Sequence, residues 1–146
     1  MRTSRFAAAG ATLLFALASA GCGEGDDTLS ASEYRSQGNA ICQEAGRSVR
    51  NAVPDEPPTV QAIQEGVAPA LARALSPLGD RLRQLRPPQS LAGGHGELLA
   101  AAESAVRTAE EAARDGSVAA RLREEGPPLE EIGERAVAIG LTSCAG

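Results

Sequence analysis

Apolar residues recur at steps of three and four along most of the chain, the spacing of one face of an α-helix. The first such segment begins at Ser30, an N-cap residue followed by Glu33 at the capping-box distance. Pro54 ends it, because proline supplies no backbone donor and crowds the preceding turn. Its predicted buried face consists of Tyr34, Gly38, Ile41, Cys42, Ala45 and Val49.

A second helical segment is expected between Thr59, an N-cap residue, and the Pro87-Pro88 pair. Pro69 and Pro77 lie inside its pattern, so we expect a bent or locally broken helix. The predicted inward face consists of Ile63, Val67, Leu71, Leu75, Leu78, Leu82 and Leu85.

Glycines divide the remaining segments. Residues 93–96 (Gly-Gly-His-Gly) predict a flexible joint, and a third helix is expected over 97–115 with Gly116 as its stop. A short helix capped by Ser117 is expected to end at Arg123, before the break at 126–128. The inward residues are expected to be Leu98, Ala102, Ala105, Val106, Ala109 and Ala113, and after the break Leu129, Ile132, Ala136, Val137 and Ile139.

The overall prediction is an all-α fold, a four-helix bundle with Pro/Gly-broken helices whose fourth helix is interrupted. Gly140 and its apolar follower Leu141 are typical of a helix end, and no segment alternates like a strand. Leu, Ile, Val and Phe supply only 23 of the 125 residues from Cys22 onward. This lies just under the ~20% level at which disorder becomes an alternative, so we expect residues 29–146 to form a single domain of modest stability.

The first 21 residues have the three parts of a signal peptide. Arg2 and Arg5 are followed by an apolar stretch over residues 6–17, which is too short to cross a bilayer of roughly 30 Å. Small residues then lead to Cys22. We therefore expect residues 1–21 to be removed on export, and no later segment has transmembrane length.

The small residues before Cys22 resemble the lipobox of bacterial lipoproteins, in which the cysteine receives a diacylglyceryl group and becomes the new N-terminus. Ala20 and Gly21 match that motif, whereas Ser19 replaces its usual aliphatic residue. The resemblance implies lipidation of Cys22 and anchoring at the outer face of the cytoplasmic membrane. Residues 22–28, polar and glycine-rich, would then be a flexible tether. Cleavage after Ala20 at an ordinary A-x-A site, with Cys22 unmodified, remains the alternative.

Composition excludes one large class of partner. The net charge is −5, and only one aromatic residue, Tyr34, lies outside the leader. An acidic chain without a basic stripe or a row of aromatic residues lacks the features of a nucleic-acid binder. No nucleic-acid partner is expected.

Cys42 and Cys144 form an even pair once Cys22 is set aside, and export brings them into an oxidising compartment. We predict a structural disulfide between them. It would close a loop of about 100 residues, worth about 4.7 kcal/mol in the chain-entropy model. A catalytic redox pair would more often have the C-x-x-C spacing, which these residues lack. The bridge also requires the chain after Gly140 to turn back onto the first helix, placing the first and last helices side by side.

Both ends of the domain resemble small exported lipoproteins of actinobacteria. These begin with a helix of the Ser-x-x-Glu-Tyr and A-x-A-I-C type and end with a Gly-Leu-x-x-Cys tail. The matching residues are Ser30, Glu33, Tyr34, Ala40, Ile41, Cys42, Gly140, Leu141, Cys144 and Gly146, with departures at Gly38 and Ala145. The resemblance implies a helical fold, export and the disulfide, and it implies no activity.

Residues for catalysis are few. His95, the only histidine, lies among glycines and is expected to be a surface loop residue without the partners of a metal ligand or general base. The glutamate pairs at 110–111, 124–125 and 130–131 fit solvated helix faces, because adjacent helical residues point about 100° apart. No nucleotide, nucleophile or metal motif is present. We expect no enzyme, no metal and no cofactor.

Two functions remain open. The first is a lipid-anchored structural or interaction module of the cell envelope, with a protein partner of unknown identity. The second is an extracytoplasmic binding protein for an apolar small molecule or lipid held between helices, which needs lining side chains that leave a void. The many alanines and glycines favour close packing, and hence the first.

Overall fold

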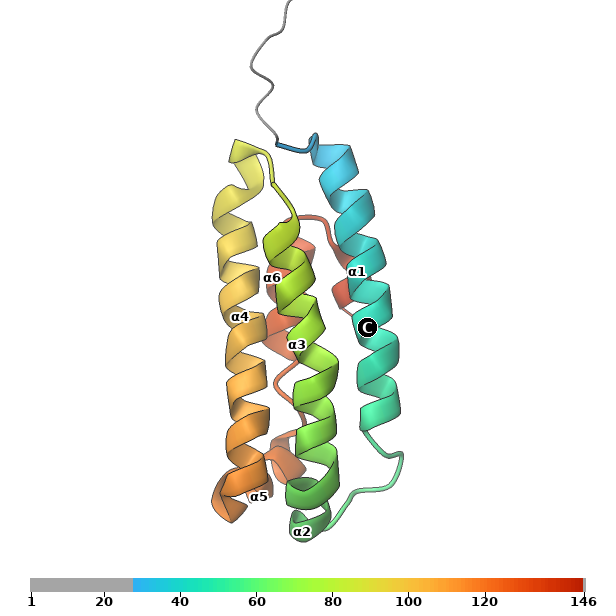
Figure 1. Ribbon diagram of the computed structural model, residues 1–146, viewed down its shortest axis with the longest axis vertical. Coiled ribbons are helices and arrows are strands. Elements are labelled where there is room, and N and C mark those ends of the chain that lie inside the picture. Colours follow the sequence, from blue (N-terminus) through green and yellow to red (C-terminus); the bar gives the residue numbers. More distant parts are fainter. Residues whose placement is uncertain (1–27, 146) are drawn as a thin grey trace, which may run out of the picture.

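The computed structural model describes residues 28–145; the predicted signal peptide, Cys22 and Gly146 lie outside them. Three long helices, α1 (Ala31–Ala52), α3 (Ala68–Gln84) and α4 (Gln89–Arg114), run side by side along the length of the domain (Figure 1). α3 packs against both α1 and α4. The shorter elements are α2 (Val60–Ala62), the π-helical η1 (Ile63–Val67), α5 (Gly116–Glu125), α6 (Glu130–Ala138) and the 3-10 turn η2 (Thr142–Cys144). The described part of the chain is therefore all-α, as predicted.

The capping box at the start of α1 is confirmed. The Ser30 hydroxyl accepts a hydrogen bond from the Glu33 amide at 3.3 Å, and the Ser30 amide donates to the Glu33 carboxylate at 3.0 Å. Hydrogen bonding to Ser30 lowers the pKa of the Glu33 carboxyl. The predicted face of α1 is buried, except that Ala45 is partly exposed.

The irregularity expected in the second helical segment is a π-turn before Pro69. The Ala68 amide donates to the carbonyl of Ile63, five residues back instead of four. Pro69 follows at the second position of α3, in the first turn, where a missing N–H costs little. Pro77 lies inside α3, which continues to Gln84.

The flexible joint predicted at residues 93–96 is wrong, because α4 runs through it without interruption. That helix begins at Gln89, well before the expected start at Glu97. Asp115, and not Ser117, caps α5, by accepting a hydrogen bond from the Ser117 amide at 2.7 Å. At residues 93–96, tertiary packing overrides the low helix propensity of glycine.

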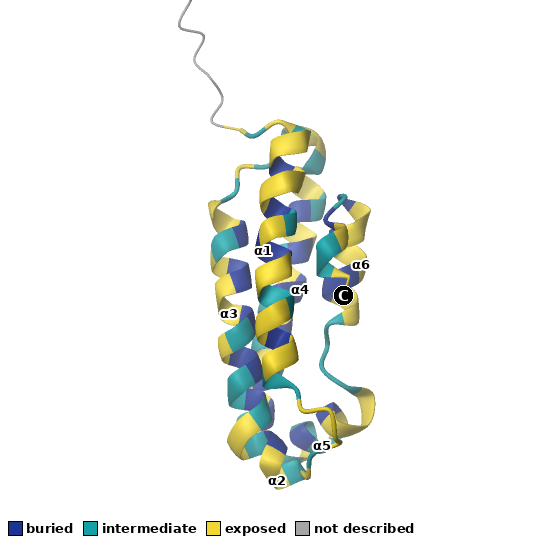
Figure 2. Cartoon of the chain, turned by 90° about the vertical axis from the view of Figure 1, so that its right-hand side faces the viewer, coloured by how far each residue is buried: buried dark blue, intermediate teal, exposed yellow. Residues whose placement is uncertain are grey.

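The fourth side of the molecule is made of two short helices. After α5, Gly126 has a φ of +81° and an extended stretch leads to α6, which packs on α4 and η2 (Figures 1 and 2). The structure thus confirms the all-α class, while no helix of full length occupies this side among residues 28–145.

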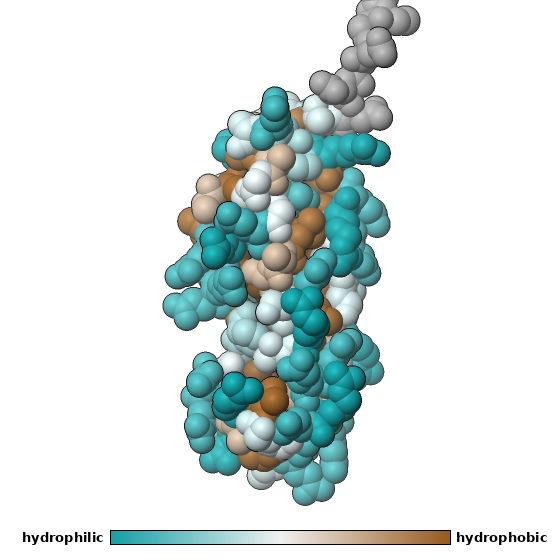
Figure 3. Space-filling view, turned by 90° about the vertical axis from the view of Figure 1, so that its left-hand side faces the viewer, coloured by the Kyte–Doolittle hydropathy of each residue, from teal (hydrophilic) through white to brown (hydrophobic). Residues whose placement is uncertain are grey.

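The core is built from few large side chains and many alanines. Leucines of α3 and α4 belong to one buried cluster with Tyr34 of α1, and the buried alanines of α4 allow close helix packing. The buried positions of the helices are dark blue in Figure 2. On the side where α4 lies, apolar patches are small and separated by hydrophilic residues (Figure 3). None of the described helices is long and apolar enough to span a bilayer. The largest fully buried side chains are Tyr34, Ile63, Leu71, Leu75, Leu82, Leu98, Leu141 and Cys42.

Candidate functional site: a groove between α1 and α6

The chain reverses direction at Gly140, where α6 ends. Gly140 has a φ of +84°, a conformation that L side chains rarely adopt. The Leu141 amide donates to the Ala136 carbonyl at 2.8 Å and the Gly140 amide to the Val137 carbonyl at 2.9 Å, the two bonds of a Schellman motif. The predicted helix end is confirmed, and it sends residues 141–145 back toward α1.

Three polar side chains of α1, spaced four residues apart, hold the returning chain. The Arg35 Nε donates to the Ile139 carbonyl at 3.2 Å, and the Asn39 Oδ1 accepts from the Ser143 amide at 2.9 Å. The Gln43 amide nitrogen donates to the Ser143 hydroxyl at 3.4 Å. This row was not predicted from the sequence, although its spacing of one residue per turn, beside the face that carries Cys42, is visible there.

Two glycines accept the apolar side chains of the returning segment. A Cβ placed on Gly38 would lie 2.6 Å from Cδ2 of Leu141, a side chain with no exposure. A Cβ on Gly94 would overlap Cγ2 of Ile139. Gly38 and Gly94 therefore serve close packing of the C-terminal segment against α1 and α4.

The predicted disulfide is present. Cys42 of α1 and Cys144 of η2 are bridged with a Cα–Cα separation of 4.7 Å, inside the roughly 7 Å that a bridge requires. The element brought onto α1 is η2, which packs against both α1 and α6. The first and last helices, predicted to lie side by side, do not pack directly: η2, and not α6, is the element packed on α1.

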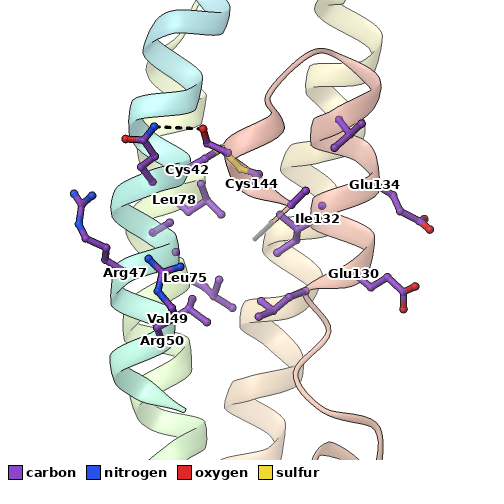
Figure 4. A pocket seen from close by; sticks show the side chains of 18 of the residues that line it. Cys42, Arg47, Val49, Arg50, Leu75, Leu78, Glu130, Ile132, Glu134 and Cys144 are labelled. Carbon is purple, nitrogen blue, oxygen red and sulfur yellow. Dashed lines mark hydrogen bonds between the residues drawn. A yellow bond between two sulfur atoms is a disulfide. The ribbon is translucent and has the colours of Figure 1, made fainter. Parts of the chain in front are cut away.

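An open groove of about 1080 Å³ runs between α1 and α6 next to the disulfide, which we call the α1–α6 groove (Figure 4). Because η2 lies between α1 and α6, the two helices do not pack directly against each other next to it, and the space between them stays open. Val137, expected to face the core, instead lines this groove and is 48% exposed. The lining residues are Cys42, Gln43, Ala45, Gly46, Arg47, Val49, Arg50, Leu75, Leu78, Leu129, Glu130, Ile132, Gly133, Glu134, Val137, Ala138, Ser143, Cys144 and Ala145.

Charged side chains are confined to the rims of the α1–α6 groove. Arg47 and Arg50 of α1 are both lining residues, but the Arg47 side chain points away from the groove (Figure 4). Neither arginine forms an ion pair among residues 28–145. On the α6 rim, Glu130 and Glu134 point away from the opening (Figure 4). The interior is thereby left to aliphatic side chains and the disulfide.

His95 is not the surface loop residue that the sequence predicted. It is 7% exposed, and its Nδ1 lies 2.8 Å from the hydroxyl of the fully buried Tyr34. Burial lowers the pKa of His95 and raises the pKa of Tyr34 to about 12, so both groups are neutral at pH 7. In the Nε2–H tautomer of the neutral ring, Tyr34 donates this hydrogen bond to Nδ1; in the Nδ1–H tautomer, the ring donates to the Tyr34 oxygen. His95 precedes Leu98 by three positions on the buried face, a periodic signal obscured by the surrounding glycines.

The other sequence candidates are not brought together. The glutamate pairs at 110–111, 124–125 and 130–131 are all exposed, and the described residues include no group of three or more His, Cys, Asp or Glu placed to hold a metal. Cys22 lies outside the described residues. In comparisons with protein-family models, curated proteins and solved structures, nothing matches this chain.

Proposed function

We propose that this chain is an exported, lipid-anchored protein of the cell envelope whose helical domain binds an apolar small molecule or lipid in the α1–α6 groove. The observation that carries the proposal is the groove itself, with its aliphatic interior and charged rims. Its volume of about 1080 Å³ lies just above the range of roughly 300–1,000 Å³ typical of small-molecule pockets.

The bonds that fix the walls of the groove support the view that it is formed before any ligand binds. The disulfide and the hydrogen bonds from Asn39 and Gln43 hold η2 on α1, and Gly133 lies close to Ala145 on the α6 side. A binding site whose walls are already ordered avoids the entropy cost of ordering them on binding. In this proposal the domain is a four-helix bundle whose shortened fourth side leaves room for a ligand.

The length of the groove favours a small ligand over a protein partner. On α1 it extends from Cys42 to Arg50, about 12 Å at 1.5 Å per residue. Two turns of helix offer far less than the roughly 800 Å² per partner of a stable protein interface. The structural or interaction module favoured by composition therefore becomes the second choice.

The proposed anchor places the groove near a supply of apolar ligands. If Cys22 carries the diacylglyceryl group, the six residues to Thr28 extend at most about 20 Å. The domain would then stay close to the outer face of the cytoplasmic membrane. We assign it binding and no reaction.

Native mass spectrometry of the full chain, purified from its own envelope, tests the proposal. We expect a retained non-covalent mass in addition to the acyl modification of Cys22. Ala138 lines the groove and is exposed, so Ala138→Phe should fill space there and remove the retained mass. Ala100, exposed on α4 outside the groove, provides the matched control Ala100→Phe, which should keep it.

Equal retention by both variants would contradict binding in the groove. A retained polypeptide in place of a small molecule would favour the interaction module.

A further inference from the structure

We infer that the Cys42–Cys144 disulfide is a redox-controlled gate of the α1–α6 groove. A small dithiol that enters the groove reduces the bond, residues 142–145 leave α1, and the apolar ligand is released. A bound ligand, in turn, shields the disulfide from reduction. This gate rests on the proposed function and adds its regulation. We call residues 142–145 the C-terminal strap.

The C-terminal strap forms one end of the groove. Ser143, Cys144 and Ala145 all line it, and the disulfide lies at that end of the opening, between α1 and α6 (Figure 4). On the α6 side, a Cβ placed on Gly133 would lie 3.4 Å from the Cα of Ala145. The strap therefore reaches from one wall to the other, and its position determines whether this end of the groove is closed.

Besides the disulfide, the strap is held on α1 by hydrogen bonds at the protein surface. The Ser143 amide donates to the Asn39 Oδ1 at 2.9 Å, and the Ser143 hydroxyl accepts from the Gln43 amide nitrogen at 3.4 Å. Thr142 and Ala145 are exposed, and Ser143 is half-buried. Hydrogen bonds in such positions contribute little, because water competes for both partners. The covalent bond is therefore the main restraint on the strap.

Reduction should release the strap without unfolding the domain. Leu141, the residue just before the strap, has no exposure, and its side chain packs against Gly38 of α1. The Arg35 Nε donates to the Ile139 carbonyl at 3.2 Å. Both contacts precede the strap in the chain, so residues 139–141 stay attached to α1 when the disulfide is broken. The opening is then a local one.

The two cysteines differ in accessibility. Cys42 is 1% exposed, whereas Cys144 is half-buried. A thiolate of the dithiol therefore attacks the Cys144 Sγ from the groove, the S–S bond breaks, and Cys42 leaves as a thiolate that takes up a proton. The second thiol then displaces Cys144. Both cysteines end as thiols, and the dithiol is oxidised to a cyclic disulfide. An apolar ligand in the groove covers this route of attack.

Binding of the ligand and reduction of the disulfide are linked. A ligand that binds the closed groove more tightly than the open one favours the oxidised protein by the same factor. With the strap released, the hydrocarbon loses its contact with the small side chains of residues 143–145. Exposing one or two methylene groups of the ligand corresponds to about a tenfold loss of affinity.

Binding of dodecanoate to the oxidised and the reduced full chain tests the gate. We expect an affinity about tenfold lower after reduction with dithiothreitol, measured by titration of methyl NMR signals. The methyl signals of Leu82 and Leu98, which are fully buried and do not line the groove, should keep their positions on reduction. Cys42→Ala/Cys144→Ala should bind like the reduced wild type and should not respond to dithiothreitol.

The rate of reduction gives the reciprocal measurement, followed by alkylation of Cys42 and Cys144 and mass analysis of their peptides. At a dodecanoate concentration about four times Kd, dithiothreitol should reduce the wild type about fivefold more slowly. Ala138→Phe, which fills the groove, should be insensitive to dodecanoate. Ala100→Phe, exposed on α4 outside the groove, should respond like the wild type.

Failure of the gate can be distinguished from failure of the proposed function. Equal affinities in the two redox states, or a reduction rate that bound dodecanoate does not change, would overturn the gate and leave apolar binding intact. Loss of the Leu82 and Leu98 signals on reduction would also overturn it, because the disulfide would then hold the whole fold and not the strap alone. If dodecanoate binds neither form, both the gate and the proposed function fail.

Discussion

At the scale of single residues, the domain depends on one buried polar pair. Tyr34 and His95 come from helices far apart in sequence, and each gives the other its hydrogen-bond partner in the core. No buried side-chain nitrogen or oxygen among residues 28–145 lacks a partner. Since a buried polar atom without a partner is costly, the pair fixes how α1 and α4 face each other.

Tyr34→Phe should therefore lower the free energy of unfolding by about 1–3 kcal/mol, because the His95 Nδ1 would stay buried without its hydrogen-bond partner. Urea denaturation at pH 7.5 measures this. The double variant Tyr34→Phe/His95→Leu removes both partners and should recover part of the loss. Additive losses in that cycle would show that the two groups do not interact.

Stability should also depend on pH through His95. Burial lowers its pKa, so below the unfolded-state value of about 6.5 the unfolded chain binds a proton that the folded chain does not. The free energy of unfolding should be highest above pH 6.5 and fall as the pH decreases from there to the folded-state pKa. His95→Gln should flatten this part of the profile between pH 6.5 and 5. An unchanged slope in the variant would assign the effect to other groups.

At the scale of elements, the C-terminal segment decides the shape of the site. The caps at Ser30 and Thr59 and the helix end at Gly140 follow from local sequence, and the structure confirms them. Of the irregularities expected at Pro69 and Pro77, the structure has a π-turn before Pro69, whereas α3 runs on through Pro77. The groove could not be predicted from that pattern, because it depends on η2 packing between α1 and α6. Val137 is an example: it follows the helical spacing of the buried residues, but it faces the open groove instead of the core.

Two glycine-to-alanine substitutions in α4 should have opposite effects on the stability of the domain. Gly94→Ala should destabilise the domain, because the new Cβ would overlap Ile139, a β-branched side chain that is 5% exposed. Gly93 has open space around it, so Gly93→Ala should stabilise the helix by about 0.5–1 kcal/mol. Thermal melts of both variants give the comparison. Stabilisation by Gly94→Ala would mean that Ile139 does not pack there.

The glycines of residues 93–96 also show why sequence reasoning failed for His95. Glycine is enriched in joints and loops, so a flexible joint was predicted there despite the helical spacing from His95 to Leu98. At Gly94 the absence of a side chain serves the approach of a residue 45 positions later in the chain. Such a contact has no local signature.

At the scale of the whole molecule, the disulfide joins the two ends of a domain with a lean core. Cys144→Ser should lower the free energy of unfolding by about 2–5 kcal/mol. Reducing agent should lower the melting temperature of the wild type similarly and leave the variant unchanged. Two reactive thiols in the unreduced, denatured wild type, besides any at Cys22, would contradict the bridge.

The proposed lipid anchor at Cys22 can be tested by measuring where the protein is located. Cys22→Ala should move the protein from the membrane fraction to the medium or leave the leader uncleaved, because the acyl chains would be absent. Detergent-phase partitioning of envelope fractions measures this. Partitioning unchanged by the substitution would instead favour cleavage after Ala20 with an unmodified Cys22.

Binding in the α1–α6 groove is most directly tested by methyl NMR of the full chain with dodecanoate. Intermolecular NOEs should connect the hydrocarbon chain to the methyl groups of Val49, Ile132 and Val137, which line the groove. Ile63 and Leu122 belong to the separate apolar cluster near α5 and should show none. NOEs to Ile63 or Leu122, or none to the three groove residues under saturating ligand, would contradict the account.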